Sequence, residues 1–268
     1  MSRIDETFAQ LRARKQTGFI AYVTAGDPDL SRSALILETL DQAGVDLIEV
    51  GIPFSDPLAD GPAIQRASER ALSSGTTLKS SLRMIETVRK RVECPLVLFT
   101  YANPVMAMGI GEFMTRAADA GVDGLLVLDL PVEEADETRE VAIASNIDPI
   151  FLLSPTTTRE RIERAAELGR GFLYAISRLG VTGQQDSMDE GVSGMINRIR
   201  QVTKRPVALG FGISQPEHVR QVSQLADAAV VGSGLVSRIA EVATSGEMAT
   251  EIHRYVHWLR SGLDCRDV

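Results

Sequence analysis

Eight short apolar runs recur along the chain, and amphipathic segments separate them. The runs cover residues 19–24, 47–51, 96–100, 124–129, 149–153, 172–177, 207–211 and 228–233. Each run is almost continuous in valine, isoleucine, leucine and aromatic residues, which is typical of strands buried on both faces. The pattern therefore predicts a parallel sheet that is covered by helices.

The segments between these runs have the polar and apolar spacing of helices. They include residues 31–44, 66–74, 78–92, 111–121, 159–169 and 194–204, and several end in glycine or a basic residue. The sequence AGVD occurs at 43–46 and again at 120–123, each time leading into an apolar run. Eight strand and helix pairs predict an α/β protein built as a (β/α)8 TIM barrel, a single domain spanning residues 1–268. An extra N-terminal helix at 3–15 is expected to cap the bottom of the barrel.

An open, doubly wound sheet is the alternative fold for the same alternation. It is less favoured because the runs number eight and because no GxGxxG motif opens the first strand–helix unit.

Composition limits the partners and the compartment. A hydrophobic content of 44% over 268 residues supports a large core, and a net charge of −8 without a basic block argues against a nucleic-acid partner. No stretch is apolar for the roughly 18 residues of a membrane helix, and the N-terminal segment is amphipathic, unlike a signal peptide. Cys94 and Cys265 lack CxxC spacing, so free thiols in a reducing cytoplasm are expected.

The stretch LIEVGIPFSDPLADGP, at 47–62, places a glutamate at the end of a predicted buried strand. Function in such barrels lies on the loops that follow the carboxyl ends of the strands. An ionised carboxylate without a partner is costly to bury, so Glu49 is expected to be paired, protonated or useful.

Other side chains that could carry chemistry are poorly placed. The four lysines, at positions 15, 79, 90 and 204, fall in helical segments or just before a strand, which disfavours Schiff-base chemistry at the top of the barrel. No histidine follows a strand, and His253 and His257 lack further ligands, so no metal site is expected. The carboxylates of Glu49, Asp56 and Asp60 remain, and they suit acid–base proton transfer.

Glycine-bearing loops at 210–214 and 230–234 follow two neighbouring strands, where bare N–H groups at a helix start can bind phosphate. The glycine-rich segment 177–194 fits either a lid over a pocket or a surface loop. Tyr22, Phe99 and Tyr174 lie near strand ends, where they would either line a substrate cavity or belong to the core.

Six motifs occur in order along nearly the whole chain: AYVTAGDP (21–28), EVGIPFSDPLADGPAIQ (49–65), YANPV (101–105), DLPVEE (129–134), SRLGVTG (177–183) and GFGIS (210–214). They resemble the motifs of the tryptophan synthase alpha chain family. The resemblance implies a lyase that cleaves indole-3-glycerol phosphate to indole and glyceraldehyde 3-phosphate without a cofactor of its own. It also implies an α2β2 complex with a beta chain that carries pyridoxal phosphate.

The resemblance also assigns residues. Glu49 would be the acid and base, and Asp60 would stabilise charge on the ring nitrogen. The phosphate would be held by Gly183, Gly212, Gly232 and Ser233, with Phe211 close by, and Thr182 would contact Asp60. Tyr22 stands where the family often has another aromatic residue. The beta chain would contact the loop with Pro53 and Asp56, the YANPV motif with Asn103, and Pro131.

Three other functions remain open from the sequence alone. They are a standalone lyase that releases free indole, a different sugar-phosphate isomerase or lyase, and a non-catalytic phosphate-binding barrel that activates a partner. The presence of both Glu49 and Asp60 argues against the last of these.

Overall fold

The computed structural model describes residues 1–176, 190–210 and 212–263. Its strands are β1 Gly18–Thr24, β2 Leu47–Gly51, β3 Leu96–Thr100, β4 Gly124–Val127, β5 Asp148–Pro149, β6 Phe151–Leu153, β7 Leu173–Ile176, β8 Val207–Gly210 and β9 Ala228–Val231. Its helices are α1 Arg3–Ala13, α2 Leu30–Gln42, α3 Pro62–Ser73, α4 Leu78–Val88, α5 Ala102–Met108, α6 Ile110–Asp119, the 3-10 turn η1 Val132–Glu134, α7 Asp136–Ala144, α8 Arg159–Leu168, α9 Glu190–Val202, α10 Pro216–Ser223, α11 Ser233–Val242 and α12 Met248–Arg260.

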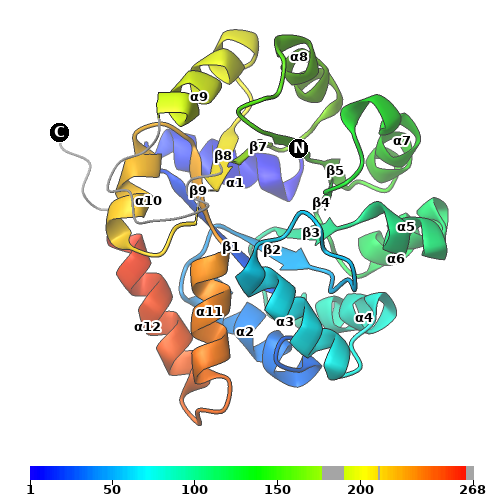
Figure 1. Cartoon of the computed structure of the whole chain (residues 1–268), viewed down its shortest axis with the longest axis vertical. Coiled ribbons are helices and arrows are strands. Elements are labelled where there is room, and N and C mark those ends of the chain that lie inside the picture. The colour runs from blue at the N-terminus through cyan, green and yellow to red at the C-terminus, as the bar shows by residue number, and fades with distance from the viewer. Residues whose placement is uncertain (177–189, 211, 264–268) are drawn as a thin grey trace.

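The strands form one parallel sheet in the order β5-β4-β3-β2-β1-β9-β8-β7-β6. The two strands at the ends of this order, β5 and β6, are separated in the chain by Ile150 alone. The sheet therefore curls into a barrel, and the helices form a ring around it (Figure 1). The barrel prediction is confirmed, and the open sheet is excluded.

One predicted strand, at 149–153, is divided in two. Pro149 pairs with β4, whereas the segment from Phe151 onward pairs with β7. The N–H groups of Asp148 and Ile150 bond the Asp123 and Leu125 carbonyls on the β4 side. The carbonyl of Pro149 faces the other side, where it accepts the Arg170 N–H, and proline has no N–H to donate there. The expected eight strands thus become nine segments among the described residues, with the division at the seam of the barrel.

Side chains on each strand alternate between two cores. On β1, Ile20 and Tyr22 point into the barrel, while Ala21 and Val23 pack under the surrounding helices. The apolar stripe of α1 (Ile4, Phe8 and Leu11) joins the inner core. This confirms the expected N-terminal helix, which closes the amino-terminal end of the barrel.

A repeated aspartate contact fixes the amino-terminal ends of three strand pairs. An aspartate stands immediately before each of β2, β4 and β9. Its carboxylate accepts an N–H from the first or second residue of the paired strand, which is β1, β3 or β8 respectively. The contacts are Asp46 with Phe19 at 2.7 Å, Asp123 with Leu96 at 2.9 Å and Asp227 with Val207 at 2.7 Å. Each carboxylate also meets an arginine: Arg260, Arg3 and Arg200 respectively. The two AGVD repeats supply Asp46 and Asp123 and so mark two copies of the same aspartate contact.

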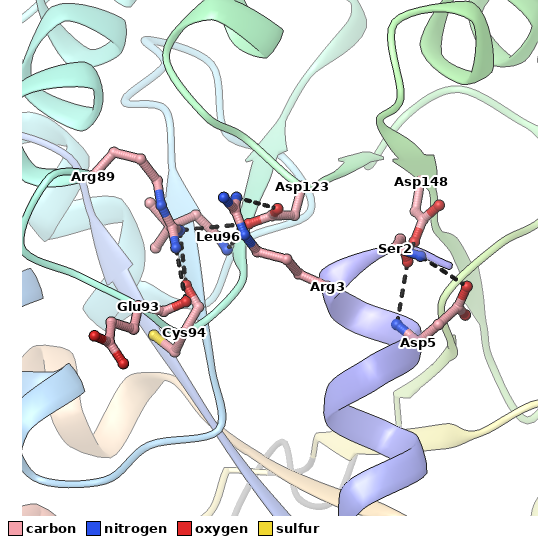
Figure 2. Close-up of polar contacts among 9 residues, drawn as sticks. All are labelled: Ser2, Arg3, Asp5, Arg89, Glu93, Cys94, Leu96, Asp123 and Asp148. Carbon is pink, nitrogen blue, oxygen red and sulfur yellow. Dashed lines mark hydrogen bonds and ion pairs between the residues drawn. The ribbon is translucent and has the colours of Figure 1, made fainter.

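Figure 2 shows the aspartate contact at Asp123, where side chains from the start of α1 take part. Arg3 donates to Asp123 at 2.9 Å, and Arg89 approaches the same carboxylate at 3.5 Å. Ser2, the N-cap of α1, donates to Asp148 at 2.5 Å. Side chains at the start of α1 therefore tie the capping helix to the start of β4 and to β5.

Within the described ranges, no helix is long and apolar enough to cross a membrane, and no three His, Cys, Asp or Glu side chains gather as they would around a metal ion. Cys94 is a free thiol, and burial raises its pKa well above the usual range. Cys265 lies outside the described residues.

Candidate active site

Glu49 lies inside the barrel because of its position in β2. Ile48 and Val50 pack under the helices, and the alternation of a strand turns the side chain of Glu49 to the opposite face. Its neighbour on β1 is Tyr22, and only 1% of Glu49 is exposed. The structure thus places a carboxyl group among apolar and aromatic side chains.

Burial changes the protonation of this carboxyl group. Loss of solvation raises the pKa of Glu49 to about 8, and the nearby Tyr174 hydroxyl opposes the shift only in part. Neither carboxyl oxygen has a hydrogen-bond partner among the described residues, so the hydroxyl acts at longer range. Glu49 therefore holds its proton at neutral pH and has two oxygens available to a ligand.

Asp60 lies on the loop between β2 and α3 and is half-buried. The Tyr101 hydroxyl donates to Asp60 Oδ2 at 3.1 Å and accepts the N–H of Ala59 at 3.1 Å. Burial raises the pKa of Asp60 to about 6, and the bond from Tyr101 lowers it in part. Asp60 is therefore mainly ionised at neutral pH, whereas Glu49 is mainly protonated. Two carboxyl groups whose environments separate their pKa values can act in different roles.

Tyr101 is a site residue that the sequence analysis assigned only to a partner-facing motif. It immediately follows β3, is buried, and stacks on Phe54 with ring centroids 5.0 Å apart. The signal that could have identified it is its place at the carboxyl end of a strand, the same signal that identified Glu49.

Tyr22, Phe99 and Tyr174 all point into the barrel around Glu49. The rings of Tyr22 and Phe99 meet edge to face at 5.1 Å, and those of Phe99 and Tyr174 lie 6.4 Å apart. Each ring is no more than 9% exposed. They belong to the inner core and also form the apolar surroundings of the Glu49 carboxyl group. The sequence analysis offered a core position and a position beside the substrate as alternatives, and a position in the inner core beside Glu49 is compatible with both.

Two glycines make room for the tyrosine hydroxyl groups. A Cβ added at Gly51 would lie 2.1 Å from the Tyr22 hydroxyl, and one at Gly210 would lie 3.1 Å from the Tyr174 hydroxyl. Both hydroxyl groups therefore reach over neighbouring strands toward the carboxyl end of the barrel.

The predicted phosphate residues Gly212 and Ser233 line one hollow, although Gly212 follows β8 and Ser233 is the first residue of α11 after β9. Gly212 has φ +65°, a conformation that favours glycine. Gly232 is the N-cap of α11, and no side chain caps its first N–H groups. An uncapped helix start of this kind can hold an anion. Thr182, Gly183 and Phe211 lie outside the described residues.

Three of the four residues expected to face a partner, Asp56, Asn103 and Pro131, are exposed. Pro53 is instead buried and offers no side chain to the surface. Two apolar residues near these, which the sequence analysis did not select, are exposed: Leu58, on the loop after β2, is 93% exposed, and Met106, in α5, is 58% exposed. Single exposed apolar residues are common on protein surfaces, so these two residues do not by themselves mark an interface.

The chain is a parallel TIM barrel, and the buried Glu49 together with Asp60 forms a site whose carboxyl groups suit proton transfer. Residues 8–260 match the sequence profile of the family described as tryptophan synthase alpha chain. The chain belongs to this family.

Relatives with that name are similar over most of their length. The protein of Arabidopsis thaliana is 44% identical over 261 residues, 97% of this chain and 95% of the relative. That of a Cyanothece species is 49% identical over 242 residues, 90% of this chain and 91% of the relative. The crystal structure of tryptophan synthase subunit alpha from Legionella pneumophila has a TM-score of 0.91 at 34% identity, covering 98% of this chain and 99% of its own.

Proposed function

We propose that Glu49 and Asp60 cleave indole-3-glycerol phosphate to indole and glyceraldehyde 3-phosphate, the alpha-subunit reaction of tryptophan synthase. Family membership makes the chain the alpha subunit of this lyase. The observation that carries the residue assignment is the pair of carboxyl groups with pKa values of about 8 and about 6 at one end of the barrel.

Glu49 is suited to both proton transfers of the reaction. It begins protonated and donates its proton to C3 of the indole ring, which weakens the bond from C3 to the glycerol chain. The resulting carboxylate then removes the proton of the adjacent glycerol hydroxyl as the carbon–carbon bond breaks and the aldehyde forms. Glu49 is protonated again at the end, so the cycle needs no external acid or base.

Asp60 is suited to the charge that this protonation creates. Protonation at C3 makes the ring nitrogen positive, and an ionised carboxylate that accepts its N–H stabilises that charge. Tyr101 holds the Asp60 side chain in place through the 3.1 Å bond to Oδ2. The second oxygen, Oδ1, has no hydrogen bond among the described residues and is available to the ring N–H.

The phosphate and the partner complete the assignment. Gly212, Gly232 and Ser233, together with Gly183, would hold the phosphate through backbone N–H groups, with Phe211 close by. Thr182 would contact Asp60. The chain works with the beta chain in an α2β2 complex, and pyridoxal phosphate is expected on the beta chain alone. A cytoplasmic location fits a chain whose described residues contain no membrane-spanning helix.

Indole release from indole-3-glycerol phosphate, with and without a beta chain, tests the proposal. The Glu49→Gln variant should lose roughly 10²- to 10⁴-fold in turnover, the usual loss for an acid–base group, while still binding substrate. Asp56→Asn is the matched control, because Asp56 lies on the same loop as Asp60 but is exposed. A larger loss in Asp56→Asn than in Glu49→Gln would overturn the assignment.

A further inference from the structure

A groove runs along the outside of the barrel between α11 and α12, which pack side by side (Figure 1). Its volume is about 600 Å³. It is lined by Gly212, Ser214, Ser233, Gly234, Ser237, Arg238, Glu241, Glu251, Arg254, Tyr255 and Trp258. Gly212 and Ser233, the expected phosphate residues, lie at one end of this groove, whereas Glu49 and Asp60 do not line it. The rest of the groove therefore extends away from the two carboxyl groups of the active site.

The end of the groove near the start of α11 is aromatic. Trp258, the single tryptophan of the chain, is 47% exposed, and its ring lies 5.6 Å from that of Tyr255. The Tyr255 hydroxyl approaches Gly234 so closely that an added Cβ would lie 3.1 Å from it. Half of a large aromatic surface is therefore left open beside the first turn of α11.

The other end of the groove carries both signs of charge. Arg238 bonds Glu241 at 2.9 Å and Glu251 at 2.7 Å, and Arg254 bonds Glu251 at 2.5 Å. These four side chains sum to zero net charge. Ion pairs that solvent reaches stabilise a fold only weakly, so a ligand that offers equivalent charges can replace one partner at low cost.

The spacing along α12 relates the two ends. Arg254 lies one turn before Trp258 and Glu251 lies about two turns before it, a rise of roughly 6 to 10 Å. A ligand that spans the groove therefore needs a ring at one end and a compact pair of opposite charges about one side-chain length away. An anion alone could pair only with the arginines of the groove, and a cation alone only with its glutamates. Either one would leave the side chains of the other sign without a ligand group to pair with.

We propose that this groove binds a zwitterionic aromatic amino acid. Its ring packs on Trp258 and Tyr255, its carboxylate meets Arg254 and Arg238, and its ammonium group meets Glu251 and Glu241. This site goes beyond the proposed lyase function and does not depend on it.

The emission of Trp258 tests the proposal directly, because no other tryptophan contributes to it. Titration of the full chain with L-phenylalanine, which does not absorb where tryptophan is excited, should give a saturable change. Phenylpropionate lacks the ammonium group and phenethylamine lacks the carboxylate. Each should bind at least about tenfold more weakly, as expected for the loss of one charged hydrogen bond.

Variants locate the binding. Arg254→Gln and Glu251→Gln should each weaken L-phenylalanine binding about tenfold and leave lyase turnover unchanged. Arg116→Gln, which breaks an exposed pair with Glu112 on α6, is the matched control and should bind normally. Gly232→Ala, which alters the expected phosphate site, should also bind normally. The proposal is overturned by the absence of a saturable change in the wild-type chain, by equal binding of the three compounds, or by binding that Arg254→Gln and Glu251→Gln leave intact.

Discussion

The position of a single residue within a strand determines the chemistry at Glu49. Residues 48 and 50 of the same strand face the helices, so the alternation of β2 directs the glutamate into the barrel. The sequence predicted a carboxyl group at a strand end, but it could not show that both oxygens lack partners. That property depends on other strands of the barrel, because Tyr22 comes from the neighbouring β1 and Tyr174 from the more distant β7.

Glu49 should make stability fall as pH rises. Its pKa is raised from about 4.5 in the unfolded chain to about 8 in the fold, so the folded state holds more protons between these values. Stability therefore decreases with pH across this window. Because Glu49→Gln is neutral at every pH, its free energy of unfolding relative to wild type should increase by about 1.4 kcal/mol per pH unit there. Urea unfolding of both proteins from pH 5 to 8 measures this, and a pH-independent difference would contradict it.

Phosphate binding should be sensitive to a side chain added at Gly232, the glycine at the start of α11. Gly232 has a negative φ of −111°, and an added Cβ meets only Tyr22 and Ile64 side-chain atoms at 3.6 Å or more, so the fold has room for the methyl group of Gly232→Ala. The methyl group would occupy the space that a phosphate needs against the helix N–H groups. Binding of glycerol 3-phosphate should weaken at least about tenfold, as expected for lost anion contacts.

Calorimetry measures this change in phosphate binding. Gly246→Ala is the control, because a Cβ there meets nothing within 4 Å. Gly212 is a poorer choice for the test, since its φ of +65° would strain any other residue. Equal affinity in Gly232→Ala and wild type would remove Gly232 from the phosphate site.

At the scale of elements, the aspartate contacts explain how neighbouring strands keep their register. Asp123 is buried, accepts the N–H of Leu96 and meets both Arg3 and Arg89. Removing one member of a buried, hydrogen-bonded charge network leaves the others unpaired. Asp123→Ala should therefore cost about 3 kcal/mol of unfolding free energy. The exposed Asp119→Ala is the control, and equal losses in the two variants would show that the contact is unimportant.

Most elements could be predicted from the sequence because apolar runs and helical spacing are local signals. The division of 149–153 could not, since it reflects which neighbour each half pairs with: β4 for Pro149 and β7 for Phe151. In the sequence, two of the aspartate contacts appear only as the repeated AGVD motif. The role of the aspartate in that motif could not be predicted, because its hydrogen-bond partner lies on another strand. The bond from Tyr101 to Asp60 likewise joins loops of two different strands.

At the scale of the whole molecule, we propose that the loops at the carboxyl end of the barrel form the surface for the beta chain. Leu58 is almost fully exposed and lies between the exposed Asp56 and the half-buried Asp60. A partner that covers Leu58 removes its apolar surface from water, whereas a charge there would have to be buried without a partner.

Leu58→Asp should therefore weaken association with the beta chain at least about tenfold, a loss of 1.4 kcal/mol or more. Lyase activity of the alpha chain alone should change little. Leu35→Asp is the matched control, because Leu35 is also exposed but lies on α2. Analytical ultracentrifugation of the mixed subunits measures the association, and equal effects of the two variants would place the interface elsewhere.

We propose that residues 1–268 form one domain, because the inner core draws on α1 and on strands from β1 to β9. A single calorimetric unfolding transition would agree with one domain, and two separated transitions would contradict it.

The most direct test of the acid–base role is the titration of the Glu49 carboxyl group itself. Infrared or carbon-13 NMR difference spectra between wild type and Glu49→Gln isolate this group. The structure predicts one carboxyl group that loses its proton near pH 8 and is missing from the variant. A Glu49 that is already ionised at pH 6 could not donate the first proton at neutral pH, and that result would contradict the proposed mechanism.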